Sequence, residues 1–127
     1  MIERVHLERY VTEIRRRFED VLGQMVEIPS ISMDPAKAPD IRRMADFARQ
    51  VLTDLGAEAQ IVETGGYPIL SGGWMTGSHH PTVTIYNHMD VQPAQEPEWT
   101  QAPFAFKNEN GLYHGRGATD DKGPALV

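Results

Sequence analysis

Two short motifs in this 127-residue chain carry side chains that commonly bind metal ions. His88 and Asp90 follow an apolar run, and Asp120 and Asp121 lie in the glycine-rich segment from Gly115 to Gly123. Imidazole is the commonest protein ligand for zinc, and one carboxylate can bridge the two metals of a hydrolytic centre. Because a catalytic zinc takes about three protein ligands plus water, the motifs predict part of a hydrolytic metal site.

The first motif lies where a predicted strand ends. Ligands gather at the carboxyl ends of strands in open α/β sheets, which favours His88 as a ligand. The carboxylate of Asp90, two residues on, can hold the other ring nitrogen. A purely structural role is the alternative, in which His88 is bonded to a neighbouring loop.

The second motif has two interpretations. Asp120 or Asp121 could cap a helix that begins near Lys122, with the lysine in solvent. Capping, however, requires neither two successive acids nor the Gly-x-Gly pattern at Gly115 and Gly117, which lets the backbone approach closely. The residues alone leave a cap and a metal ligand equally open.

The remaining histidines are weaker candidates. His79 and His80 precede a proline in a predicted exposed turn, and His6 lies on the solvent side of a predicted helix. His114 is close to the glycine-rich segment in sequence, and its role is left open. No Gly-x-Ser-x-Gly elbow, phosphate-binding loop or catalytic cysteine is present.

The elements that must position these side chains are of both types. Apolar residues at spacings of three and four predict helices over residues 3–27 and 39–55, the second ended by Gly56. Strand signals follow, with a hairpin over 59–63 and 69–75, a central strand over 82–86, and short strands around 104–107 and 112–114. The pattern predicts an α/β fold, a mixed sheet flanked by helices.

Composition narrows the class of protein. A hydrophobic share of 40%, with 24% charged residues, is typical of one small globular domain. A formal net charge of −6 argues against nucleic acid as a partner. The lack of cysteine excludes disulfides and thiolate ligands. With no long apolar stretch and no apolar signal core at the start, we expect a cytoplasmic protein that does not bind membranes.

Nearly the whole chain, and most specifically the region from Thr82 to Pro124, resembles the M20 metallopeptidases, in particular the dipeptidase branch that includes carnosinase-like enzymes. The resemblance rests on the order and spacing of His88-Met89-Asp90-Val91-Gln92-Pro93, Trp99, Ala102-Pro103-Phe104, Asn110-Gly111 and Gly115 to Pro124. Met89 and His114 depart from it, because many relatives carry tyrosine at these positions.

The resemblance implies a role for each site residue. His88 corresponds to a ligand of one zinc, Asp90 to the acid that orients it, and Asp120 to the carboxylate that bridges both metals. The peptide bond from Asp120 to Asp121 is cis in many relatives. The implied reaction is hydrolysis of a dipeptide or similar short amide by metal-activated water, with two zinc ions, or manganese or cobalt, as cofactors.

The resemblance also implies that the chain is incomplete. Residues 1–127 correspond to the N-terminal portion of a zinc-peptidase catalytic domain of the phosphorylase/hydrolase-like class, without the lid or dimerisation domain. The general-base glutamate and the other ligands would follow Val127, so we expect the chain alone to be inactive and to expose apolar surface. The full-length parent could form a homodimer. An N-acyl amino acid amidohydrolase and a non-enzymatic, metal-free module are the alternatives.

Overall fold

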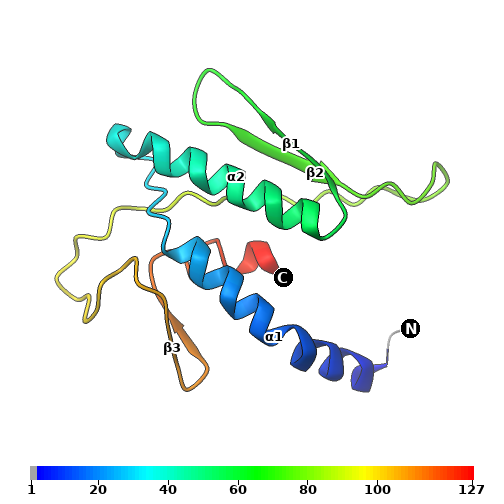
Figure 1. Ribbon diagram of the computed structural model, residues 1–127, viewed down its shortest axis with the longest axis horizontal. Coiled ribbons are helices and arrows are strands. Elements are labelled where there is room, and N and C mark those ends of the chain that lie inside the picture. The colour runs from blue at the N-terminus through cyan, green and yellow to red at the C-terminus, as the bar shows by residue number, and fades with distance from the viewer. Residues whose placement is uncertain (1–2) are drawn as a thin grey trace.

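A computed structural model describes residues 3–127 as two long helices and two β-hairpins joined by irregular segments (Figure 1). The elements, in chain order, are α1 (Arg4–Val26), the 3₁₀ turn η1 (Pro35–Lys37), α2 (Ala38–Asp54), β1 (Glu58–Val62), β2 (Ile69–Gly73), β3 (Lys107–Glu109), β4 (Leu112–His114) and the 3₁₀ turn η2 (Pro124–Leu126).

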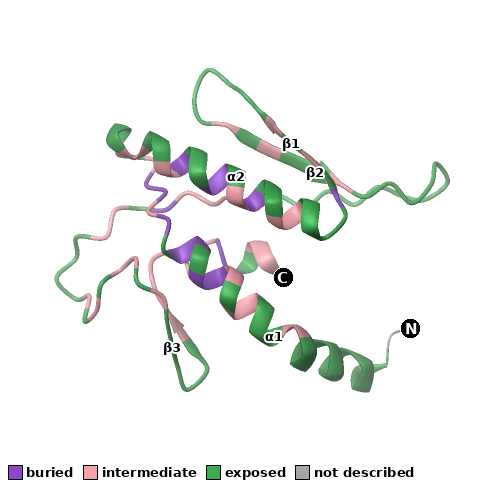
Figure 2. Cartoon of the chain, viewed as in Figure 1, coloured by how far each residue is buried: buried purple, intermediate pink, exposed green. Residues whose placement is uncertain are grey.

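Both predicted helices are confirmed, but they are buried to different extents. The C-terminal end of α1 buries Leu22 and Met25, whereas Tyr10 near its start is 57% exposed (Figure 2). Helix α2 buries Ile41 and Met44 and ends before Gly56, whose positive φ of 84° is the left-handed geometry that glycine favours. The core therefore begins where the two helices come together.

The first hairpin is confirmed and packs against α2. Strands β1 and β2 are antiparallel, with Glu58 opposite Gly73 and Val62 opposite Ile69. In Figure 1 this hairpin lies on the side of α2 that faces away from α1. The loop between its strands contains Tyr67, whose side chain reaches back toward the segment that joins the helices.

The second hairpin is present, although its first strand lies later in the chain than predicted. The strand predicted around residues 104–107 begins only at Lys107 in β3. The reason is the two-residue turn at Asn110 and Gly111, whose φ angles of 54° and 81° pair Glu109 directly with Leu112. A tight turn of this kind fixes the strands immediately beside it.

Two other predicted elements are wrong. Residues 82–86 form no strand, because no segment within residues 3–127 pairs with them, and Val83 and Ile85 are 80% and 79% exposed. The helix predicted to begin near Lys122 is limited to the short turn η2. High β-propensity does not make a strand without a hydrogen-bonded neighbour.

A small core joins these elements and lies beneath the site residues. Its centre is formed by Met25, Ile28 and Met44, against which Met89 packs. A parallel bridge between Ile31 and Val91 connects the segment after α1 to the segment after His88. The α/β class is confirmed, and the strands of residues 3–127 form two antiparallel pairs with this single parallel bridge.

Candidate metal centre

The structure brings the three predicted site residues together around the His88 ring. Its Nε2 lies 3.1 Å from Asp120 Oδ1. Its Nδ1 lies 3.1 Å from the Asp90 carbonyl oxygen and 3.3 Å from Asp90 Oδ1. Each ring nitrogen therefore faces a carboxylate, although the two motifs are 32 residues apart.

This arrangement favours positive charge at the ring. Partial burial acts to lower the pKa of His88, but the Asp90 carbonyl and the carboxylates of Asp90 and Asp120 outweigh it and raise the pKa above its ordinary value. The same negative field would attract a metal cation in place of the proton. The side chains of His88 and Asp120 are 41% and 84% exposed, so an ion can reach both from solvent.

Asp121 holds the two motifs against each other. Its Oδ2 accepts a hydrogen bond from the His88 backbone nitrogen at 3.3 Å. The Asn87 amide, with its nitrogen turned toward this carboxylate, donates to the same oxygen at 3.1 Å. The peptide bond between Asp120 and Asp121 is cis, as the resemblance implied.

Lys122 is fully buried beneath the glycine-rich segment. Its Nζ donates hydrogen bonds of 2.8 Å to the carbonyl oxygens of Met25 and Ile28. Burial lowers the pKa of Lys122 to about 8, partly offset by the charge of Asp90. The alternative with a solvated Lys122 and a capping aspartate is therefore wrong. The following turn η2 begins after Gly123 and has no side-chain cap.

Glycine allows the second motif to approach the first closely. At Gly117, where φ is +88°, an added Cβ would lie 2.8 Å from Val91 Cγ1 and 3.0 Å from Lys122 Cδ. At Gly123 an added Cβ would overlap the Ala118 carbonyl oxygen. Gly117 is thus explained by packing against the segment that follows His88, and Gly123 by a close approach within the glycine-rich segment itself.

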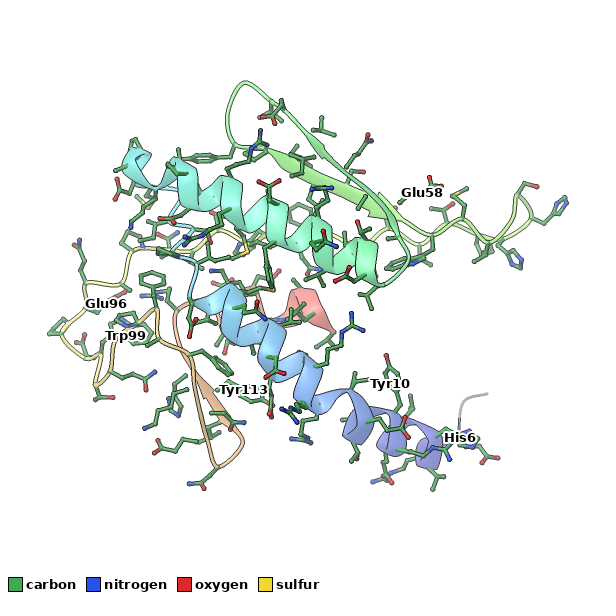
Figure 3. All side chains as sticks on the ribbon, in the orientation of Figure 1. His6, Tyr10, Glu58, Glu96, Trp99 and Tyr113 are labelled. Carbon is green, nitrogen blue, oxygen red and sulfur yellow. The ribbon has the colours of Figure 1, made fainter. Side chains whose placement is uncertain are left out.

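The irregular loop after Asp90 is tied to the same segment. Arg116 Nη2 donates a 2.5 Å hydrogen bond to Glu96 Oε1, and Trp99 Nε1 donates to Glu96 Oε2 at 2.8 Å. The Arg116 guanidinium lies 5.2 Å from the centre of the Trp99 ring. Figure 3 shows Glu96 and Trp99 close together in this loop. A hydrogen bond to its own backbone, followed by the bonds from Trp99 and Arg116, lowers the pKa of Glu96.

The other histidines take no part in this cluster. His6, His79 and His80 are exposed, and His114 lies in β4 opposite Lys107. Sequence reasoning missed Ser30, Ser32 and the burial of Lys122. The signal was the segment Ile28 to Ser32, in which two serines follow a proline.

The residues of the cluster fit two ligands of one metal ion. Two atoms bound to the same tetrahedral zinc at 2.0–2.1 Å would be about 3.3 Å apart. The 3.1 Å between His88 Nε2 and Asp120 Oδ1 is close to that separation. Within residues 3–127, however, no group of three or more His, Cys, Asp or Glu side chains could hold a metal ion. The described residues thus supply part of a ligand set.

Known proteins match the chain over most of its length. Residues 84–127 match the model of peptidase family M20/M25/M40. The Cys-Gly metallodipeptidase dug1 of Schizosaccharomyces pombe is 37% identical over 94% of this chain and 28% of its own. The Beta-Ala-His dipeptidase of Mus musculus is 33% identical over 95% of this chain and 27% of its own.

A solved structure shows the same fold. The crystal structure of human carnosine dipeptidase 1 superposes on this chain with a TM-score of 0.86 and 31% identity, covering 93% of this chain and 28% of that one. The helices of residues 3–127 are too short or too polar to cross a membrane. The chain belongs to the M20 peptidases and spans about 28% of the length of its dipeptidase relatives.

Proposed function

We propose that this chain is the N-terminal portion of the catalytic domain of a dizinc dipeptidase, acting on dipeptides or similar short amides. The observation that carries the proposal is the His88 ring held between Asp90 and Asp120. Its relatives include a Cys-Gly metallodipeptidase and a Beta-Ala-His dipeptidase. Zinc suits a ligand set of imidazole and carboxylate groups, and manganese or cobalt suits it in place of zinc.

Each residue of the cluster has a distinct role in this proposal. In this proposal Asp90 accepts a hydrogen bond from the protonated Nδ1 of His88, which fixes the ring and leaves Nε2 to bind metal. Asp120 has an exposed carboxylate that would hold metal together with His88. When bound, the metals would polarise the amide carbonyl and lower the pKa of water. Asp121 and the loop held by Arg116 keep the two motifs in place.

We also propose a cytoplasmic location for the protein and a small peptide as its partner. A chain without cysteine suits a reducing cytoplasm, and its net charge of −6 suits neither nucleic acid nor an anionic membrane surface. The partner we propose is the small peptide substrate. An N-acyl amino acid substrate is distinguished from it by comparing turnover of a dipeptide and an N-acetyl amino acid by the full-length parent.

Zinc binding to the purified chain tests the ligand assignment. We expect one zinc ion to bind the wild-type chain in competition with a chromophoric chelator, and His88→Ala and Asp120→Ala each to weaken binding at least about tenfold. The matched control is His79→Ala, which removes an exposed imidazole outside the cluster and should leave the affinity unchanged. Equal zinc affinity of wild type and His88→Ala would refute the assignment.

A further inference from the structure

The Asp90 carboxylate is held from two sides. Its Oδ1 lies 3.3 Å from His88 Nδ1, while its Oδ2 accepts a hydrogen bond of 2.5 Å from Ser32 Oγ. Hydrogen bonds from a hydroxyl to a carboxylate are short and strong because the acceptor is charged. Rotation of the carboxylate would break both contacts, so Ser32 restrains the oxygen that faces the histidine.

The backbone holds Ser32 in this position. The segment after α1 forms the parallel bridge of Ile31 with Val91, supported by a 2.9 Å hydrogen bond from Val91 N to the Ser30 carbonyl. Ser30 Oγ donates to the Met89 carbonyl at 2.7 Å. From the β1–β2 loop, the Tyr67 hydroxyl donates to the Ser32 carbonyl at 2.8 Å. The segment after His88 and the β1–β2 loop therefore both hold the backbone of residues 30–32, which carries the Ser32 side chain.

The position of Asp90 decides between two forms of the neutral imidazole. With a proton on Nδ1, His88 donates to Asp90 and keeps Nε2 free. With a proton on Nε2, it donates to Asp120, 3.1 Å away, and Nε2 cannot bind a metal. His88 Nδ1 already faces the Asp90 carbonyl oxygen. A well-oriented Asp90 carboxylate gives Nδ1 a second acceptor and therefore favours the first form.

We propose that Ser32 is a positioning residue of the metal centre. Its hydroxyl orients Asp90 so that His88 carries its proton on Nδ1 and presents Nε2 to the metal, and Tyr67 fixes Ser32 from the hairpin. The role in metal binding rests on the proposed function. The effect on the imidazole does not, because it exists in the metal-free protein.

The ¹⁵N chemical shifts of His88 in the metal-free chain provide the test, measured at a pH at which the imidazole is neutral. We expect the wild type to show the Nδ1-protonated form in excess and Ser32→Ala to shift the population toward the Nε2-protonated form. Ser32→Thr keeps the hydroxyl and should restore the wild-type shifts. Identical His88 shifts in wild type and Ser32→Ala would overturn the proposal.

Ser30→Ala is the matched control. It removes a hydroxyl from the same segment, bonded to the Met89 backbone and not to Asp90. Because Ser30 helps to dock the segment, we expect its His88 shifts to change less than those of Ser32→Ala, and a change as large as that of Ser32→Ala would mean that only docking of the segment matters. Tyr67→Phe, on the outer hairpin, should cause a smaller change in the same direction as Ser32→Ala. It also provides a readout if Ser32→Ala does not fold.

Zinc affinity separates this proposal from the proposed function. Ser32→Ala should weaken zinc binding about tenfold, the lower end of the loss usual for residues that orient a ligand. If the wild-type chain bound no zinc at His88, the proposed function would fail, while the ¹⁵N shifts would still decide the role of Ser32. Unchanged zinc affinity together with unchanged shifts would reject Ser32 as a positioning residue.

Discussion

At the scale of single residues, Lys122 shows how one buried group links the site to the core. Its Nζ donates to the carbonyl oxygen of Met25 in the last turn of α1, where a cation is also favoured by the helix dipole, and to that of Ile28 just beyond the helix. The residue therefore holds the motif that carries Asp120 against the helix. Asp120 itself is 84% exposed and makes no such contact with the core.

We predict that Lys122→Met lowers the free energy of unfolding by about 1–3 kcal/mol, because two buried carbonyl groups lose their partner. Urea denaturation of the metal-free chain measures the change. Lys107→Met is the control, since the Lys107 side chain is exposed and pairs with Glu109 in the same hairpin. A stability equal to that of the wild type would show that the buried ammonium gains nothing over an apolar side chain.

We predict that Gly117→Ala also destabilises the chain, by about 1–3 kcal/mol. The added methyl would enter the contact with Val91, and the backbone at this position has a positive φ. Thermal unfolding followed by circular dichroism would show a lower midpoint. Gly65→Ala serves as the control because, among residues 3–127, no atom beyond its two chain neighbours lies within 4 Å of the added Cβ. Equal midpoints for the two variants would contradict the packing argument.

At the scale of elements, Tyr113 connects β4 to α1. Its hydroxyl donates to Glu19 Oε1 at 2.9 Å, and its ring lies 5.9 Å from that of Phe18 and 5.8 Å from that of Phe106. Burial, followed by the Glu19 carboxylate, raises the pKa of Tyr113. The contact between β4 and α1 therefore favours a neutral phenol.

The sign of the pH dependence follows from this raised pKa. Above the ordinary tyrosine pKa the unfolded chain loses the proton first, so the contribution of Tyr113 to stability, complete below that pKa, decreases as the pH rises through the folded-state value. We predict that Tyr113→Phe removes this part of the alkaline loss of stability, measured by urea denaturation across that range. Identical pH profiles for wild type and Tyr113→Phe would contradict it.

The sequence predicted the elements well where their signals are local. Helical periodicity located α1 and α2, and Asn110-Gly111 located the second hairpin. The contacts that build the site are not local. Ser32 and Asp90 are 58 residues apart, and Lys122 and Met25 are 97 apart. Hydrophobic periodicity does not encode such contacts. Because lysine is rarely buried, the sequence predicted that the Lys122 side chain would be exposed to solvent.

At the scale of the whole molecule, apolar side chains remain exposed beside the site. Val83, Ile85 and Tyr86 are 79% to 86% exposed and lie in an extended segment without charge or proline. A segment with high β-propensity and unpaired backbone groups is a template for pairing with another chain. The exposed apolar surface expected from the sequence is therefore found in this segment.

We predict that the chain self-associates through residues 82–86. Sedimentation velocity should show species larger than the monomer that increase with concentration, and Ile85→Lys should reduce them because a charge opposes strand pairing. Leu112→Lys is the control, since Leu112 is 65% exposed but lies in a paired strand.

We also predict that the chain does not hydrolyse dipeptides, because the described residues supply no group of three or more metal ligands. Release of amino acids from a dipeptide by purified, zinc-loaded chain would show that two ligands suffice, provided that His88→Ala abolishes it.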